Sequence, residues 1–568
     1  MYRRFVVFLT AVATLITPTR SHAQGAACEG RVVSRVDVQS QPPPFSGYAK
    51  KWQAAAHTIG LHHADTRDEV IRAFLSLAPG KLCTERRRAE SERVLRAQPF
   101  LARATVQVVA DTGNAVVVHV TTVDEVPVLV SGRFRGIRPE SFGIGNENLG
   151  GAALHVAGRV ESGGAYRTNF GGLVEHDAFL GHPWRLVISG DRYQIGHRYG
   201  AEIEHPFFTD LQRVSWHGGI ETNTDYERFE RPAGDPLALQ ANDRSWDLSG
   251  MMRVYGTTTV TLVGAAISGR RFDPAARGIV VSDSGLLADS GSALANRYSA
   301  FRVGRIGVIA GVRRVVFQEV SGFDALVGSQ DVARGAMIGV FAAKGLSQFG
   351  TPDMLVSSAA YAGAANRNTL VATLAQAEAR RDPVTNRWDS MIGSARTAFY
   401  WGSAPGAVLV VDDEVSGGKD SRIPLQLSFR DINTGLIGYR NSGLAGSVRN
   451  IVRAEIRWSG ESVVRKADLG FATFAHVGSL RAGDAPYGVN ATRTTIGASL
   501  LGAYPTRSKR LYRVDLGFPL TRGGPGSGGV EVRFSSLDRT QGFWTEPVDV
   551  SRARTGTAPS RLFAWPDR

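Results

Sequence analysis

The most extensive pattern along the chain is an alternation of apolar with small or polar residues, in segments of about ten residues. It begins near Phe142 and recurs toward the C-terminus, with clear segments at residues 152–160, 184–193, 257–267, 469–477 and 529–534. Alternation places successive side chains on opposite faces of a strand, and about ten residues suffice to cross a bilayer at a tilt. The pattern predicts a mainly β protein in which residues 142–568 form a transmembrane antiparallel β-barrel of about 16 strands. A soluble β-sandwich or propeller is the alternative.

Residues 31–126 carry a different pattern. Residues 31–38 predict a short strand, and the sequence Thr-Arg-Asp-Glu from Thr66 fits a capping box at the start of a helix. A second helix with a charged outer face begins at Thr84. Residues 104–109 and 116–120 predict two strands joined by the turn Asp-Thr-Gly-Asn. The order strand, helix, helix, strand, strand predicts one compact α/β domain.

The first 23 residues predict a secretory signal peptide. Arg3 and Arg4 precede an apolar run that is too short for a transmembrane helix, and Ser21-His22-Ala23 offers a cleavage site. Export would place Cys28 and Cys83 in an oxidising compartment, where a disulfide between them is plausible.

Composition narrows the classes of partner. No later stretch reaches 18 consecutive apolar residues, which excludes a bundle of transmembrane helices. The formal net charge is +14. On an exported protein this charge suggests anionic lipid headgroups or acidic polypeptides as partners more than nucleic acid. Solvated loops are the simpler explanation for the same charge.

No enzyme motif occurs. The chain lacks H-E-x-x-H, G-x-S-x-G and a phosphate-binding G-x-x-x-x-G-K-[ST], so we expect neither an enzyme nor a cofactor. The glycine-rich residues 523–529 predict a hairpin turn. His57, His62 and His63 are expected to be solvated rather than bound to metal, and residues 412–414, which are acidic, are expected at a loop tip.

The N-terminal domain resembles a POTRA domain, the periplasmic module of outer-membrane assembly and secretion barrels. The resemblance rests on the sequence Ser-Glu-Arg-Val-Leu from Ser91, on Gln-Pro-Phe from Gln98, and on the strand with Val106 and Val108. It implies that this strand offers its edge to an extended client by β-augmentation.

The barrel resembles the BamA and TamA family of outer-membrane assembly factors, which includes the transporters of two-partner secretion. Residues 142–150 look like the family's first barrel strand and residues 512–520 like its penultimate one, followed by a last strand at 529–537. About 30 further residues follow. Either the last strand runs later than this, or these residues form an extension.

In this family a lumen loop carries Val-Arg-Gly-Phe or Val-Arg-Gly-Tyr at its tip, and its arginine meets an aspartate on the barrel wall. Here the matching positions are Ile437 and His476, so both charges are absent. Removing one partner of a buried pair costs about 3–5 kcal/mol, whereas removing both can be nearly neutral. We therefore expect docking by packing of Ile437 and Tyr439. The full predicted site comprises tip residues Ile437, Gly438, Tyr439 and Arg440, and wall residues Phe474, His476 and Gly478.

Two alternatives stand beside this interpretation of the loop. Arg440 could replace the missing arginine, or the segment is an ordinary turn with a chance Gly-Tyr.

The resemblance implies an outer-membrane assembly or translocation factor. Unfolded client protein would bind the POTRA edge and a barrel seam between residues 152–160 and 529–537. Outer-membrane lipid or lipopolysaccharide and accessory proteins would be further partners. The alternatives are a secretion pore for one partner protein and a passive outer-membrane porin, which would need no POTRA domain.

Overall fold

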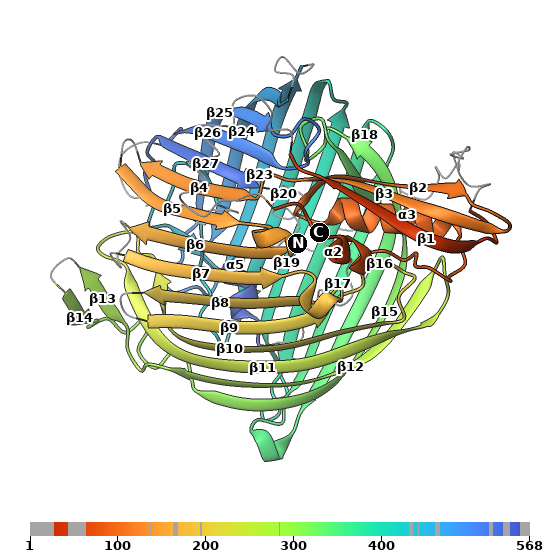
Figure 1. Ribbon diagram of the computed structural model, residues 1–568. Helices are drawn as coiled ribbons and strands as arrows, with labels where there is room; N and C mark the ends of the chain where they lie inside the picture. Colours follow the sequence, from red (N-terminus) through yellow and green to blue (C-terminus); the bar gives the residue numbers. More distant parts are fainter. Residues whose placement is uncertain are drawn as a thin grey trace, which may run out of the picture.

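The computed structural model describes residues 28–43, 64–135, 138–162, 168–193, 196–282, 285–430, 435–440, 442–460, 466–521, 526–537 and 546–556. They form a closed antiparallel β-barrel and a small N-terminal α/β module at one side of it (Figure 1). The barrel predicted from the alternation is therefore confirmed. The predicted signal peptide, residues 1–23, lies outside the described residues.

Twenty strands form the barrel wall, and each is antiparallel to its two neighbours. In chain order they are β4 (Val128–Arg135), β5 (Arg138–Asn146), β6 (Leu154–Ser162), β7 (Thr168–His176), β8 (Arg185–Tyr193), β9 (Gly196–His205), β10 (Val214–Phe229), β11 (Leu237–Tyr255), β12 (Val260–Pro274), β15 (Phe301–Ser321), β16 (Ser329–Gly345), β17 (Met354–Ala365), β18 (Thr369–Arg381), β19 (Trp388–Gly402), β20 (Gly406–Lys419), β23 (Val448–Ser459), β24 (Asp468–Arg481), β25 (Ala491–Ala503), β26 (Leu511–Pro519) and β27 (Glu531–Leu537).

Shorter elements lie outside the wall. The hairpin of β13 (Ile279–Ser282) and β14 (Gly285–Ala288) continues from the edge of β11, while β12 pairs directly with β15. The other short elements are η2 (Leu149–Gly151), η3 (Phe179–Gly181), η4 (Ser347–Phe349), β21 (Leu427–Ser428), β22 (Ala445–Gly446) and α5 (Val548–Ala553).

The predicted start of the barrel and the predicted number of strands are both wrong. The wall begins at Val128 rather than at Phe142, and it has 20 strands rather than about 16. Strand length ranges from seven residues in β27 to 21 in β15, so a count of ten-residue segments misjudges the number. Glycine and proline interrupt the alternation in β4 and β5, but main-chain pairing needs only N–H and C=O groups.

The two faces of the wall differ in polarity. Along β15 the inward side chains of Arg305, Ile309 and Arg313 are buried, whereas Val308 and Val316 point outward and are more than half exposed. The same outward exposure of large apolar side chains recurs around the ring. An apolar outer surface around a charged interior is the arrangement of a transmembrane β-barrel. No helix among the described residues is long and apolar enough to cross a membrane.

The N-terminal module contains β1 (Val32–Gln41), α2 (Asp68–Ala73), α3 (Glu85–Ala97), β2 (Leu101–Ala110) and β3 (Ala115–Asp124), in the predicted order. Its sheet has the order β1-β3-β2, with β1 parallel to β3 and β2 antiparallel to it. The predicted capping box at Thr66 is wrong, because Arg67 precedes α2 and no side chain caps it. Thr84 does cap α3, where its hydroxyl accepts the Arg87 N–H.

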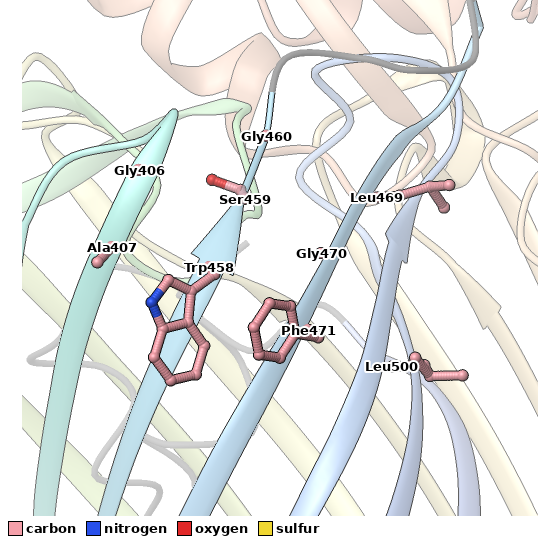
Figure 2. Close-up of a pocket in the computed structure, with 9 residues that line it drawn as sticks. All are labelled: Gly406, Ala407, Trp458, Ser459, Gly460, Leu469, Gly470, Phe471 and Leu500. Carbon is pink, nitrogen blue, oxygen red and sulfur yellow. The ribbon is translucent and has the colours of Figure 1, made fainter.

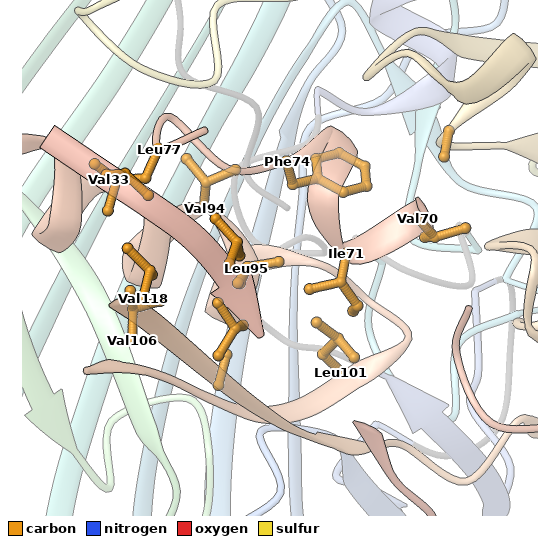
Figure 3. Close-up of a cluster of buried hydrophobic side chains, with 14 of the residues drawn as sticks. Val33, Val70, Ile71, Phe74, Leu77, Val94, Leu95, Leu101, Val106 and Val118 are labelled. Atoms are coloured by element: carbon orange, nitrogen blue, oxygen red, sulfur yellow. The ribbon is translucent and has the colours of Figure 1, made fainter. Parts of the chain in front are cut away.

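Both helices of the module pack on one face of its sheet. Figure 3 shows Ile71 of α2 next to Leu101 of β2, and both Leu95 of α3 and Phe74 belong to the same cluster. Ala153, Ala178 and Phe208, from turns of the barrel, complete the same cluster. The structure also contains a disulfide between Cys28 and Cys83, which ties the start of β1 to the segment before α3.

Candidate functional site at the barrel seam and lumen

The barrel closes where its last strand, β27, pairs with its first, β4 (Figure 1). Three residue pairs form this seam within the described residues, including Val532 opposite Phe134. The Ser536 hydroxyl adds one bond across the seam to the Val130 carbonyl, at 3.1 Å. By contrast, β10 and β11 share 16 pairs on another part of the wall. Among the described residues, the seam therefore has the shortest ladder of paired residues between neighbouring strands of the wall.

The predicted seam is wrong on one side. Residues 152–160 lie mostly in β6, which pairs with β5 on one side and with β7 on the other. The error follows from the predicted barrel start, because β4 and the beginning of β5 precede residue 142. The other predicted side, residues 529–537, does contain the closing strand β27.

A long loop between β20 and β23 folds into the lumen, and Gly438 lies at its predicted tip. The Gly438 N–H donates to Glu531 Oε2 on β27 at 2.7 Å, and its carbonyl accepts the Gly529 N–H at 2.8 Å. Its φ is +89°, and an added Cβ would lie 2.9 Å from both Gly529 O and Pro519 Cδ. Glycine is needed here, because the left-handed backbone and the close approach both oppose a side chain.

Ile437 and Tyr439 dock the tip by packing. Ile437 covers Gly517 of β26 so closely that an added Cβ there would overlap it, and its carbonyl accepts the Thr495 hydroxyl at 2.7 Å. Tyr439 is fully buried, and its hydroxyl donates to the Thr494 carbonyl at 2.9 Å. The tip thus lies against β25 and β26 through apolar contacts and neutral hydrogen bonds.

Arg440 extends the tip to the other side of the seam. Its guanidinium lies 2.7 Å from the Glu161 carboxylate on β6, and its side chain is 11% exposed. β6 follows β4 and β5 on one side of the seam, and β27 with Glu531 lies on the other. The four tip residues therefore contact strands on both sides, and we call Ile437, Gly438, Tyr439 and Arg440 the latch.

The predicted wall residues lie on the inner face of β24, next to the base of the loop. Gly478 leaves space for Phe429 and Leu436, because an added Cβ would lie 2.7 and 2.8 Å from their side chains. The rings of Phe474 and His476 stack with centroids 4.6 Å apart. The contacts of the tip described above are with β25, β26, β27 and β6, so Arg440 pairs with β6 rather than with β24.

Buried arginine–carboxylate pairs line the inside of the barrel, and they were not recognised in the sequence. Arg305 pairs with Asp353 at 2.7 Å, and Arg449 pairs with Glu414 at 2.7 Å. All four side chains are almost fully buried, and each charge needs its partner because an isolated buried charge is costly. The signal available in the sequence was the presence of charged residues at the inward positions of alternating strands. Local periodicity, however, does not show which of these charged residues pair with one another.

The prediction that residues 412–414 form a loop tip is wrong. They lie within β20, where Asp412 pairs with Arg453 at 2.8 Å and Glu414 joins the inner wall. Three consecutive acidic residues can occupy a strand here because arginines on β19 and β23 neutralise the inward carboxylates.

The C-terminal extension enters the lumen. Figure 1 places α5 within the outline of the barrel wall, and residues 546–556 contact the inner faces of β12, β15, β18 and β19. Val550 and Ala553 are fully buried in a cluster with Ile392 of β19 and with Leu425 and Leu427 of the lumen loop. Of the two sequence alternatives, an extension after the last strand is therefore correct.

The N-terminal module is docked across one mouth of the barrel. Arg96 of α3 pairs with Asp331 of β16 at 2.7 Å. The Lys509 ammonium, in the turn between β25 and β26, donates to the carbonyls of Arg96 and Gln98 at 2.6 Å each, which satisfies the end of α3. β16 and β26 lie on well separated parts of the ring, so the module reaches across the mouth.

Asp124 marks the junction between the module and the turn that follows β5. It is fully buried and accepts the Thr66 N–H at 2.8 Å and the Thr66 hydroxyl at 2.7 Å. Asn148 of the barrel donates to the same hydroxyl oxygen at 2.8 Å. Burial raises the pKa of Asp124 to about 6, because the hydrogen bonds from Thr66 offset only part of the desolvation.

The predicted client edge is occupied by the module itself. Val106 and Val108 lie on β2, an edge strand that pairs only with β3 in the described sheet, and both side chains contribute to the module core. The Val106 N–H donates to Glu92 at 3.0 Å, and its carbonyl accepts Arg88 at 2.9 Å. A client strand at this position would have to displace two side chains of α3.

An open apolar groove of about 580 Å³ lies on the outer face of the wall, near the turn that follows β23. Figure 2 shows the Trp458 indole and the Phe471 ring side by side on neighbouring strands, with Leu500 beyond them. The two rings stack with centroids 4.6 Å apart. Aromatic side chains at a strand end are typical of the belt at a membrane interface.

No group of three His, Cys, Asp or Glu side chains suited to a metal ion occurs in the part of the chain that the structure describes. His57, His62 and His63 lie outside the described residues, so their predicted solvation stays a prediction.

The fold and the site define a large closed β-barrel with a latched lumen loop and an α/β module at one mouth. No family model and no curated protein matches the chain. It is similar to BamA from Haemophilus ducreyi lacking POTRA domains 1–3, with 11% identity, 88% of this chain and 85% of that chain covered, and a TM-score of 0.34. It is also similar to CdiB from Escherichia coli, with 12% identity, 90% and 77% coverage and a TM-score of 0.42. A third structure, CdiB from Acinetobacter baumannii, has 10% identity, 89% and 73% coverage and a TM-score of 0.36. At these values the likeness assigns no function.

Proposed function

We propose that this protein is an outer-membrane barrel that inserts client polypeptides into the membrane or exports them across it. Client strands would pair at the seam between β27 and β4. The observation that supports the proposal is a three-pair seam whose two sides are held together from inside by the latch.

The physical argument concerns the cost of opening the wall. A main-chain hydrogen bond contributes about 0.5–1.5 kcal/mol net, so the few bonds of the seam hold it with only a few kcal/mol. Separating β10 from β11 would break several times as many bonds. An opened seam exposes the N–H and C=O groups of β4 and β27, and such edges pair readily with an extended strand.

The proposed location of the protein is the outer membrane, and it rests on the polarity of the two faces of the wall and on the sequence of the N-terminal residues. The apolar outer surface would contact outer-membrane lipid, including lipopolysaccharide, and the predicted signal peptide would direct export. The N-terminal module, as a single POTRA-like domain, would face the periplasm and receive clients or accessory proteins. No cofactor takes part in this mechanism.

A secretion pore for one partner protein is the second candidate. The charged inner wall favours it, since a polar lining suits a polypeptide in transit. A passive porin is disfavoured, because the latch and α5 occupy the lumen and the module lies across one mouth.

Site-specific photocrosslinking in cells tests the proposal. Photoreactive residues replace Phe134 of β4 and Val532 of β27, which face each other across the seam. Matched probes replace Ile220 and Trp246, which face each other outward on β10 and β11. A further probe replaces Ser394 on the inner wall.

Several outer-membrane proteins trapped at the seam, with none at β10 and β11, would support insertion. One exported protein trapped at Ser394 would support secretion instead. If no protein adduct forms at the seam or in the lumen while the barrel is folded, both candidates are rejected.

A further inference from the structure

Several main-chain groups of the C-terminal extension bind to charged side chains of the lumen wall. The Thr555 N–H donates to Glu378 Oε1 at 2.6 Å, and the Gly556 N–H donates to the same oxygen at 3.1 Å. The Thr555 carbonyl accepts Arg305 at 2.8 Å. Arg270 donates to the Arg554 carbonyl and, at 3.4 Å, to the Arg552 carbonyl.

Three wall residues on three strands thus bind five main-chain groups. Arg270 is on β12, Arg305 on β15 and Glu378 on β18, and we call them the lumen cradle. Asp243 and Asp353 hold the two arginines in place, at 2.9 and 2.7 Å. The cradle therefore presents positioned donors and an acceptor at the spacing of a polypeptide backbone.

Side chains of the extension also contact the wall and the lumen loop. The Glu546 carboxylate accepts the Ser394 hydroxyl of β19 at 2.6 Å. Val550 and Ala553 pack against Ile392 and the loop residues Leu425 and Leu427. At the cradle itself the Thr555 hydroxyl is the side-chain group that joins the main chain, with a 3.0 Å bond to Glu378. α5 thus supplies sequence-specific anchoring, whereas the cradle binds groups that every polypeptide contains.

We propose that the lumen cradle is a binding site for the main chain of an extended client polypeptide, and that residues 546–556 occupy it in the resting state. The proposal rests on the proposed function for the assumption that the client is unfolded. A client that enters the lumen competes with the extension for Arg270, Arg305 and Glu378. Because α5 also packs on the base of the loop that carries the latch, release of the extension removes contacts from that loop.

The test uses the full-length chain and two matched substitutions on α5. Val550→Asp places a charge in the buried cluster and releases the extension, whereas Val548→Asp makes the same change at a position that is 45% exposed. Two dye-labelled peptides serve as probes: one with the sequence of residues 546–556, and one with the same composition in scrambled order. Fluorescence anisotropy measures binding to protein in detergent, and resistance to unfolding in cold SDS confirms a folded barrel.

We expect Val550→Asp to bind both peptides on the order of tenfold more tightly than the wild type, because the competing segment has left. Val548→Asp should match the wild type. Adding Glu378→Ala to Val550→Asp should abolish binding, and Glu378→Gln should restore part of it, because an amide oxygen still accepts a main-chain N–H.

Two results would overturn the proposal. If folded Val550→Asp binds neither peptide, the cradle takes no free polypeptide. If it binds the native but not the scrambled peptide, the cradle is only a dock for the chain's own extension. Failure of the proposed function is distinguishable, since it appears as absence of client adducts at Phe134, Val532 and Ser394 whatever the peptides do.

Discussion

The strands beside the seam and the strands of the far wall differ in length and in pairing. From β4 to β9 the strands have eight to ten residues, and β26 and β27 have nine and seven. From β10 to β16 they have 15 to 21 residues. Because the main-chain ladder grows with strand length, fewer hydrogen bonds join the strands beside the seam than join the strands of the far wall. The latch lies on the side with the shorter ladders, which is the side that the proposed function requires to open.

The largest expected effect comes from closing the seam covalently. The pair Phe134→Cys and Val532→Cys places two thiols at facing positions, and Cys28 and Cys83 are already bonded to each other. Oxidation should abolish client insertion or export in cells, and reduction should restore it. The pair Ile220→Cys and Trp246→Cys, on β10 and β11, should leave activity unchanged. If oxidation abolishes activity equally in both cysteine pairs, the seam differs in no functional way from the β10–β11 pairing.

Gly438→Ala should weaken the latch. The left-handed backbone and the 2.9 Å approach to Gly529 and Pro519 predict a cost of about 2–4 kcal/mol. Hydrogen exchange of the β27 amides should accelerate, whereas exchange of β10 and β11 should not change. Gly460→Ala is the control, because an added Cβ there meets nothing within 4 Å. Unchanged exchange in β27 would show that the latch does not hold the seam.

The junction between module and barrel should depend on pH through Asp124. Its folded pKa is raised to about 6 from an ordinary 3.8, so folding favours the protonated form. The stabilisation is complete below pH 4 and is lost as pH rises through about 6, a change of about 3 kcal/mol in the free energy of unfolding. Hydrogen exchange, corrected for intrinsic rates, gives the opening free energies of the β3 amides. These free energies should decrease as pH rises over this range.

Asp124→Asn should remove this decrease of the opening free energy with pH. Asp111→Asn should retain the decrease, because the pKa of exposed Asp111 is lowered by its hydrogen bond with Ser34. If the decrease with pH persists in Asp124→Asn, another titratable group causes it.

The smallest effect concerns the ion pair between Arg440 and Glu161. The pair is partly buried, so we expect a coupling free energy of about 1 kcal/mol in a double-mutant cycle of Arg440→Gln and Glu161→Gln. The readout is again exchange of the β27 amides. Zero coupling would restrict the latch to Gly438, Ile437 and Tyr439.

Parts of the candidate site could be predicted because they are local. The Gly-Tyr pair identified the tip of the lumen loop through its resemblance to the family's motif, and the order of elements in residues 31–126 agrees with the structure. The partners of the tip could not be predicted. Glu531 is 93 residues from Gly438, and Glu161 is 279 residues from Arg440. Periodicity also gave no sign of the lumen cradle, since Arg270, Arg305 and Glu378 come from three strands.

The sequence by itself determined that the chain forms a β-barrel and that a module with the element order strand, helix, helix, strand, strand precedes it. These properties follow from alternation, helix spacing and turn residues, which act over a few neighbouring positions. Tertiary structure alone decided the number of strands, the partner of β27, the acidic residues that hold the latch and the place of α5. Each of these depends on which distant main-chain and charged groups meet when the ring closes, and local periodicity carries no information about that choice.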